Sequence, residues 1–332
     1  MRRLVVTEFG DPDVLEWQDA PEPRPGPGEA LVRVRAFSVI WADVLERRGR
    51  YPGQPQPPLP AGHEMTGVVE ALGPGVEEPC VGTRVLGTDP AGAAAAELVA
   101  MPAHVLYPVP DEVGDVAAAA MIGTYTTAEI AITTFARLAP TDAVLIHAAA
   151  GGLGSACLQL CRVHGCGTLV ATAGGAEKAA RVAAWGADVA VDYTRDDFVA
   201  AALEATDGRG VDVVLESVGG EVLGRSFDCV APAGRMVCMG ASSGRSSDRF
   251  RLQTLFEKGI SVSGFTLGLW IDARLPAVAE AAGRVLALAA KKRIDPVIAG
   301  VFPPERIADA HRLLEGRGAV GRIVVSLAAG VG

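Results

Sequence analysis

The chain has 332 residues, of which 49% are hydrophobic and 21% are charged, a composition typical of soluble globular proteins. Its formal net charge of −9 argues against a nucleic-acid-binding surface. No apolar run reaches the roughly 20 residues that a membrane-spanning helix needs. The apolar run that follows Arg3 is too short to be the hydrophobic core of a signal peptide. We therefore expect a cytoplasmic protein of two domains that binds neither nucleic acid nor membrane.

The first hundred residues predict short β-strands. Apolar, β-branched runs separated by turn residues lie at 2–7, 29–36, 67–72 and 84–86. Proline-rich segments at 21–28 and 51–60 are incompatible with helix and predict exposed, extended loops.

From about residue 116 the pattern changes to alternating helices and strands. Helices are expected over 115–136, 177–185, 198–205 and 277–291. Strands are expected near 143–147, 168–172, 188–191, 211–215, 235–239, 260–264 and 321–326. Repeated units of this kind predict an α/β fold with a parallel, doubly wound sheet. We expect this domain over 119–295, a β-rich domain from 1–118 with 296–332, and the active site in the cleft between them.

A glycine-rich turn between a strand and a helix start lies at 144–154. Ala148, Gly151 and Gly154 form an A-x-x-G-x-x-G pattern directly after the apolar run 144–146. Such a turn holds a dinucleotide pyrophosphate against helix N–H groups, and glycine lets the backbone approach the phosphate. The pattern predicts a Rossmann domain with cofactor contacts from Ala150, Gly151, Gly152, Leu153 and Gly154.

Six cysteines occur, at positions 80, 157, 161, 166, 229 and 238. Disulfides are not expected in a cytosolic chain of this size. Cys157 and Cys161 share a helical stripe with apolar neighbours, which predicts small core residues. No paired C-x-x-C occurs, so no structural zinc is expected.

With this order of elements, the chain resembles the medium-chain dehydrogenase/reductase superfamily over nearly its full length. The likeness is greatest to its zinc-independent quinone oxidoreductase and enoyl reductase branch. The stretches that carry it are 42–45, 48–52, 62–64, 67–76, 81–85, 147–154, and 177–178 followed by 186–188. The resemblance implies that the β-rich domain, built from the N-terminus and the C-terminal tail, is GroES-like, and that the protein is a homodimer with its contact near strand 261–265.

The cofactor expected from the sequence is NADPH. The second Rossmann strand runs into Ala173-Gly174-Gly175 without the acidic residue that binds the ribose of NAD. The resemblance implies that Lys178 and Tyr193 contact the 2′-phosphate, although glycines replace two serines of the family. Alternatively, Lys178 is only a solvated helix residue. Further expected cofactor contacts lie at strand ends and in the tail, at Thr172, Gly240, Phe265, Thr266 and Arg322.

The motif Gly62-His63-Glu64 resembles the one that supplies a zinc-binding histidine in alcohol dehydrogenases. A catalytic zinc needs three protein ligands. The family's thiolates would fall near 40–41 and 121–125, and neither stretch contains a cysteine. No metal is therefore expected. His63 and Glu64 are interpreted either as polar contacts in the cleft or as a hydrogen-bonded pair that supports the domain junction.

We expect hydride transfer to a small hydrophobic acceptor, a quinone or an α,β-unsaturated carbonyl compound, which carries its own electron sink. The resemblance implies that Tyr51 donates a proton and that Thr127 lies against the nicotinamide; Tyr51 could instead simply pack in its loop. Ile40, Trp41 and Tyr125 are expected to line the substrate cleft, with Ile40 where the family usually has Asn. The alternatives are a zinc-independent carbonyl or alcohol dehydrogenase, a tailoring enzyme, and a non-catalytic NADP(H)-binding protein.

Overall fold

The computed structural model describes residues 1–51, 53–89, 92–247 and 252–328. It divides into two units, Met1–Gly123 with Ala282–Gly332, and Thr124–Ala281. Pro52, from the stretch 48–52, and the last four residues of the expected segment 296–332 lie outside the described residues. Among the described residues, no helix has both the length and the apolar character needed to cross a bilayer.

The first unit is built on a seven-stranded sheet in the order β15-β16-β3-β5-β6-β8, with β7 also paired to β3. The strands are β3 (Glu29–Val39), β5 (Glu64–Leu72), β6 (Arg84–Thr88), β7 (Leu98–Pro102), β8 (Leu106–Pro108), β15 (Ile298–Phe302) and β16 (Arg322–Ser326). A smaller sheet has the order β2-β1-β4, with β1 at Arg2–Val6, β2 at Leu15–Asp19 and β4 at Leu59–Pro60.

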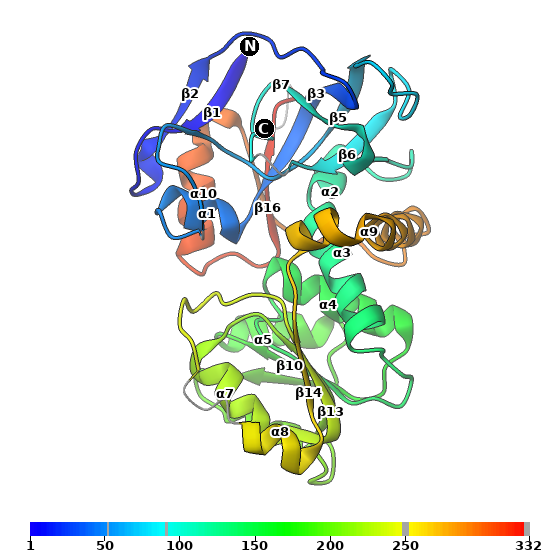
Figure 1. Cartoon of the computed structure of the whole chain (residues 1–332). Helices are drawn as coiled ribbons and strands as arrows, with labels where there is room; N and C mark the ends of the chain where they lie inside the picture. Colours follow the sequence, from blue (N-terminus) through cyan, green and yellow to red (C-terminus); the bar gives the residue numbers. More distant parts are fainter. Residues whose placement is uncertain (52, 90–91, 248–251, 329–332) are drawn as a thin grey trace. The chain divides into compact units, whose positions relative to one another are not determined.

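The C-terminal tail belongs to this unit. β16 pairs antiparallel with β3, so that Val324 lies opposite Ser38, and Figure 1 shows the two strands side by side. Val324 packs with Ala36, Ala119 and Ala120 in a small buried core. The expectation that the C-terminal tail completes the β-rich domain is therefore confirmed.

Short helices complete the first unit. They are α1 (Trp41–Arg47), α2 (Asp115–Ala119) and α10 (Ile307–Glu315), with single 3₁₀ turns at Pro12–Val14, Ala103–Val105 and Pro304–Arg306. The proline-rich segment 21–28 is a loop of exposed and half-buried residues, as its composition predicts.

The second unit is a six-stranded parallel sheet in the order β11-β10-β9-β12-β13-β14. Its strands are β9 (Val144–Ile146), β10 (Leu169–Ala173), β11 (Val189–Asp192), β12 (Val211–Glu216), β13 (Val230–Cys238) and β14 (Ser261–Gly264). The chain runs outward from β9 in one direction and then returns to β12 in the other, which is the doubly wound arrangement expected from the sequence.

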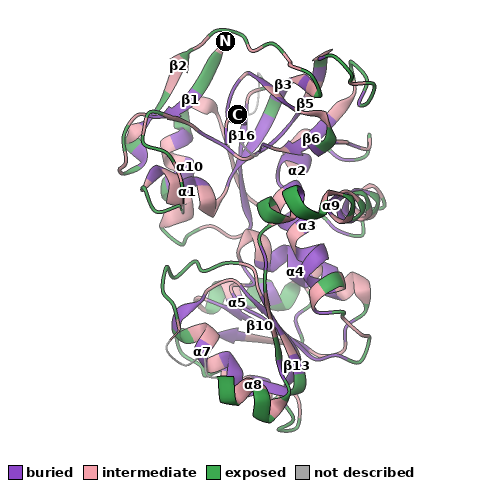
Figure 2. Ribbon diagram, viewed as in Figure 1, coloured by how far each residue is buried: buried purple, intermediate pink, exposed green. Residues whose placement is uncertain are grey.

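The helices between these strands are α4 (Gly152–His164), α5 (Ala176–Ala184), α6 (Phe198–Glu204), α7 (Gly220–Cys229) and α8 (Leu252–Lys258). Leu145, Val170 and Val214 from three central strands form the core with residues of α6 and α7. β10 is buried along its whole length, whereas α8 is largely exposed (Figure 2). Cys157 and Cys161 are buried in α4, as their spacing predicts.

The expectation of one continuous helix over 115–136 is wrong. The structure instead has α2, then α3 (Ile122–Ile130), then one π-helical turn, Ala131–Phe135. A Cβ on Gly123 would lie only 1.7 Å from Oε1 of Glu64, so the chain between α2 and α3 bends around a buried carboxylate. A local helical pattern contains no information about that distant side chain.

The last long helix, α9, covers Leu267–Ala290 and begins ten residues before the expected start at 277. Its backbone is non-helical at Arg274, two residues before Pro276. Proline lacks the N–H for the helix ladder and crowds the preceding turn. The sequence therefore predicts only the helical segment that follows Pro276 and does not predict the helical turns that precede it, from Leu267 onward.

Candidate active site

The glycine turn leads from β9 into α4 as the sequence predicts. Gly151 is the residue before the first turn of α4, and Ala148 has a left-handed backbone with φ of 51°. A Cβ on Gly154 would lie 2.3 Å from the carbonyl oxygen of Ala148 and 2.6 Å from Cα of Ala149. Glycine is therefore required at 154 because the helix packs directly on the turn, which holds the N-terminus of α4 at the end of β9.

Thr172 and His147 form a buried pair next to this turn. Nδ1 of His147 lies 3.2 Å from Oγ1 of Thr172, and its Nε2 lies 2.9 Å from Oγ of Ser226. Burial lowers the pKa of His147 to about 3, so the ring is neutral at pH 7. The hydroxyl of Thr172 is thus engaged by a neutral imidazole.

Tyr193, which follows β11, lies against the loop between β10 and α5, and Lys178 is in the helix that this loop enters. A Cβ on Gly174 would lie 2.6 Å from the hydroxyl oxygen of Tyr193, so the phenol occupies the place of a side chain at 174. Lys178 is half-buried in the first turn of α5, and burial lowers the pKa of its ammonium group. Both residues lie next to the loop that would meet an adenosine ribose.

A carboxylate that the sequence of the β10 tip does not reveal also lies at this loop. Asp192 ends the neighbouring strand β11, opposite Ala173, and its Oδ1 accepts the N–H of Gly175 at 2.8 Å. The same oxygen accepts the hydroxyl of Thr194 at 2.7 Å. These hydrogen bonds, the one from Thr194 first, lower the pKa of Asp192, which is therefore ionised at pH 7.

Gly240, Phe265 and Thr266 follow the ends of β13 and β14, so they lie at the same carboxyl edge of the sheet. The ring of Phe265 stacks on Phe135 with centroids 4.8 Å apart and contacts Trp270. Its side chain is therefore part of an aromatic cluster, and the cofactor contact expected from Phe265 remains a prediction. The hydroxyl of Thr266 accepts the N–H of Leu269 at 3.4 Å, at the start of α9.

Tyr125 and Thr127 lie on α3. The side chain of Tyr125 is fully buried, whereas Thr127 is half-buried. Between them, the hydroxyl of Thr126 is buried without a hydrogen-bond partner among the described residues. The roles expected for Tyr125 and Thr127 remain predictions.

In the first unit, His63 lies beside α1 rather than beside Glu64. Its Nε2 is 3.0 Å from Oε2 of Glu46 and 3.9 Å from Oδ1 of Asp43. Burial alone would lower the pKa of His63, but its contact with Glu46 and the charge of Asp43 raise it to about 9. Desolvation raises the pKa of Asp43 to about 6 against the opposing charge of His63.

Glu64 has a different set of partners. Its Oε2 accepts hydrogen bonds from Oγ of Ser38 at 2.7 Å and from Nη2 of Arg322 at 2.6 Å, and all three residues are buried. The interpretation of His63 and Glu64 as a hydrogen-bonded pair is therefore wrong. Successive residues entering a strand point to opposite faces, so one turns toward α1 and the other toward β3 and β16.

Arg322 is thus the ion-pair partner of Glu64 within the first unit. Its Nη2 bonds both Glu64 and Ser38, and its Nε is buried without a hydrogen-bond partner among the described residues. Its approach to the cofactor phosphates remains a prediction. Neither Ser38 nor Asp43 nor Glu46 was identified from the sequence, although Asp43 and Glu46 are spaced to share one face of a helix.

The remaining candidates of this unit surround α1. Ile40 precedes the helix and donates its N–H to Oδ2 of Asp43 at 2.7 Å, and Trp41 is its first residue. Tyr51 is 39% exposed, and its ring centroid lies 6.3 Å from that of His63. The structure therefore groups Tyr51, His63, Ile40 and Trp41 around one helix.

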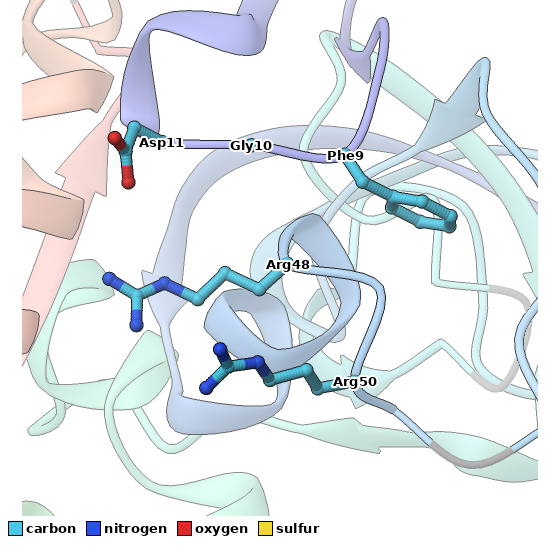
Figure 3. Close-up of a pocket in the computed structure, with 5 residues that line it drawn as sticks. All are labelled: Phe9, Gly10, Asp11, Arg48 and Arg50. Atoms are coloured by element: carbon cyan, nitrogen blue, oxygen red, sulfur yellow. The ribbon is translucent and has the colours of Figure 1, made fainter.

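A pocket of about 390 Å³ lies nearby and is lined by Phe9, Gly10, Asp11, Arg48 and Arg50 (Figure 3). The two arginine side chains extend in the same direction from the end of α1. Arg48 also contacts Glu315, with Nη2 3.1 Å from Oε2. None of the residues predicted for the active site lines this pocket, so it is not assigned to the candidate site.

The sequence matches two families of domains. Residues 26–111 match the alcohol dehydrogenase GroES-like domain, and residues 152–314 match the zinc-binding dehydrogenase domain. The synaptic vesicle membrane protein VAT-1 homolog of Homo sapiens is 31% identical over 342 residues, which cover 98% of this chain and 86% of that protein. The 2-haloacrylate reductase of a Burkholderia species is 32% identical over 328 residues, 97% of each chain.

The fold is also that of a solved reductase. The crystal structure of Escherichia coli quinone oxidoreductase complexed with NADPH superimposes with a TM-score of 0.91 at 29% identity, covering 98% of this chain and 100% of the other. The relation extends over both units and not only over the second one.

The residues present do not fit the thiolate-bound zinc that the name of the second domain family implies. Of the six cysteines, Cys80 is exposed and the other five belong to the second unit, in α4, just after α4, in α7 and in β13. Neither the stretch before α1 nor the start of α3 holds a thiol ligand.

Proposed function

Because this chain belongs to the medium-chain dehydrogenase/reductase superfamily, in its quinone oxidoreductase and VAT-1 branch, we propose that it is an NADPH-dependent reductase of quinones or α,β-unsaturated carbonyl compounds. The observation that carries the proposal is the carboxyl edge of the parallel sheet. There the glycine turn, the Tyr193–Gly174 contact and the ends of β13 and β14 meet in the pattern of a dinucleotide site.

The residues of this edge fit the cofactor. The N-terminus of α4 at Gly151–Gly154 would hold the pyrophosphate, and Lys178 with Tyr193 would hold the 2′-phosphate. NADPH, when bound, supplies the hydride. Thr127 would orient the nicotinamide ring.

A conjugated acceptor needs little assistance from the protein, because its own carbonyl accepts the electron pair that the hydride displaces. We assign to Tyr51 the proton that completes the reduction, at the carbon α to the carbonyl of an enone. Its 39% exposure supports access by a ligand. A Lewis acid is not required for this chemistry, which is consistent with the missing thiolate ligands.

The test is NADPH oxidation measured with quinones, enones, enoyl thioesters and simple ketones. We expect turnover of conjugated acceptors and a decrease in kcat/KM of about 100-fold in Tyr51→Phe. Tyr107→Phe, on β8 of the same unit, is the matched control and should retain wild-type rates. Turnover of ketones alone would favour the carbonyl or alcohol dehydrogenase, and an unchanged Tyr51→Phe would remove that residue from the mechanism.

The cofactor preference has its own test, because Asp192 places a negative charge beside the loop that would receive the 2′-phosphate. We expect NADPH to be preferred over NADH through Lys178. Lys178→Ala should lower the NADPH-to-NADH ratio of kcat/KM about tenfold, and Asp192→Asn should raise it. Arg181→Ala, on the exposed side of α5, is the control. A ratio that none of these substitutions alters would refute the assignment.

A second candidate is a dinucleotide-binding protein without turnover, which the 31% identity to a VAT-1 homolog favours. Tight NADPH binding, measured by quenching of tryptophan fluorescence, with no oxidation across the whole acceptor panel would support it. A tailoring reaction on the same fold would show turnover only with substrates outside that panel.

We also propose that the protein is a homodimer formed at the edge strand β14. The neighbouring helix α8 exposes Leu252 by 78% and Phe256 by 88%, an apolar pair one helical turn apart. Sedimentation equilibrium should give twice the chain mass, and Phe256→Ser should shift it toward the monomer. A monomeric wild type would refute the proposal.

A further inference from the structure

Three potential metal ligands converge beside α1. One ligand atom from each of Asp43, Glu46 and His63 lies within 4.8 Å of the other two. Nε2 of His63 is 3.0 Å from Oε2 of Glu46 and 3.9 Å from Oδ1 of Asp43. Among the described residues, this is the one cluster of at least three histidine, cysteine or carboxylate groups with such spacing. We propose that it binds a divalent transition-metal ion through one imidazole nitrogen and two carboxylate oxygens.

The chain arranges this cluster through two local devices. Asp43 and Glu46 are three residues apart on α1, so both side chains project from one face of the helix. Gly62 has φ of 94°, and a Cβ there would lie 2.6 Å from the backbone nitrogen of Ala95. Only glycine permits this turn, which directs His63 toward α1 at the entry to β5.

The strongest evidence for a ligand is the carboxylate oxygen that has no hydrogen bond. Asp43 is only 7% exposed, and its Oδ2 accepts the N–H of Ile40 at 2.7 Å. This bond fixes the carboxylate and leaves Oδ1 buried, facing His63 at 3.9 Å, without a hydrogen-bond donor among the described residues. A buried carboxylate oxygen is normally satisfied, so an orphaned one indicates a missing partner.

His63 gives the same indication. Its Nε2 is buried and lies 3.0 Å from Glu46, yet the angle between them does not make a hydrogen bond. Nε2 of His63 and Oε2 of Glu46 do not point at each other, so the lone pairs of both atoms can be directed at one metal ion between them. With metal–ligand distances of about 2.1 Å, ligands at right angles are about 3.0 Å apart and opposite ligands about 4.2 Å. The separations of 3.0 and 3.9 Å fall within that range.

The donor set differs from a thiolate zinc site, because it has two carboxylate oxygens and no sulfur. Nitrogen and oxygen donors of this kind suit Zn²⁺, Co²⁺ or Mn²⁺. Such an ion would link α1 to the start of β5 within the first unit. The inference departs from the expectation of a metal-free protein and does not depend on the proposed reductase activity.

The test uses the full chain, treated with EDTA and then transferred to chelator-free buffer. Titration with Co²⁺ should give one ion per chain and visible d–d bands without the intense near-ultraviolet band of thiolate ligation. Zn²⁺ should displace the Co²⁺ and abolish the bands. His63→Gln and Glu46→Gln should each weaken Co²⁺ binding by at least about tenfold.

His104→Gln is the matched control, because His104 is an exposed histidine of the same unit, and it should bind Co²⁺ as the wild type does. If circular dichroism shows that the two ligand variants do not fold, the absorption spectrum of the wild type with Co²⁺ still tests the proposal, because it reports whether the ion is bound and whether a thiolate is among its ligands. No ion bound at 100 µM Co²⁺, a thiolate band, or unchanged binding in folded His63→Gln would each overturn the proposal. The cluster would then be a protonated histidine between two carboxylates.

Discussion

The buried imidazole of His147 makes stability depend on pH in a way that can be calculated. Oγ of Ser226 donates to a backbone carbonyl at 2.8 Å, so it accepts the Nε2–H of His147, and the bare Nδ1 accepts the hydroxyl of Thr172. Only the neutral ring satisfies both contacts. Its ring also meets that of Phe198 edge-on, with centroids 4.8 Å apart.

The magnitude follows from linkage. The pKa of His147 is about 3 in the folded protein and about 6.5 in an unfolded chain, so the unfolded state binds the proton first as pH falls. The contribution is fully present above pH 6.5 and is lost progressively as pH falls toward 3. At pH 5 the unfolded state gains about 2 kcal/mol from this single group.

The assay is reversible urea unfolding at pH 7 and pH 5, with the difference in free energy of unfolding as the readout. His147→Gln should remove about 2 kcal/mol from the wild-type difference. His311 is equally buried, with its pKa lowered to about 3, and His311→Gln should remove a similar amount. His104→Gln, at an exposed position, should leave the difference unchanged. If His147→Gln left it unchanged as well, the assignment of a neutral buried ring would be refuted.

Three further outcomes are expected. Gly154→Ala should abolish NADPH binding in a fluorescence titration, because its Cβ would lie 2.3 Å from a backbone carbonyl oxygen, whereas Gly268→Ala, with open space around it, should bind normally. Glu64→Gln should lower the free energy of unfolding in urea by about 3–5 kcal/mol, because it leaves the charge of buried Arg322 uncompensated. As a control, Glu177→Gln removes one partner of an exposed ion pair and should lower it by less than about 1 kcal/mol. Removal of metals by EDTA should leave quinone reduction within about twofold of the untreated rate, and a larger loss would contradict a hydride transfer that needs no Lewis acid.

Much of the dinucleotide-binding unit follows from local sequence. Alternating strands and helices predict a parallel sheet, and the carboxyl ends of parallel strands meet at one edge. The glycines at 151 and 154 therefore locate the expected pyrophosphate site once β9 is recognised. The structure gives a different reason for glycine at 154 than the sequence suggests: a Cβ there would collide with the backbone of the turn at Ala148 and not with a ligand.

The charged groups of the candidate site were far harder to assign. Asp192 lies at the β10 loop only because β11 pairs with β10 in the register that places it opposite Ala173. The residues at the tip of β10 contain no information about this pairing. The same limitation explains the break in the helix at 120–121, next to Gly123, whose backbone lies against the carboxylate of Glu64 from another strand.

By itself, the sequence determined the six strands of the second unit, the helices α5 and α6 between them, and the position of the glycine turn after β9, because these depend on neighbours within a few residues. The tertiary structure decided the partners of the buried charges. Glu64 pairs with Arg322, 258 residues away, and His63 with Glu46 on a helix that precedes it. A buried charge is stable only beside a compensating group, and that group is supplied by strand pairing and helix docking, which no short run of residues encodes.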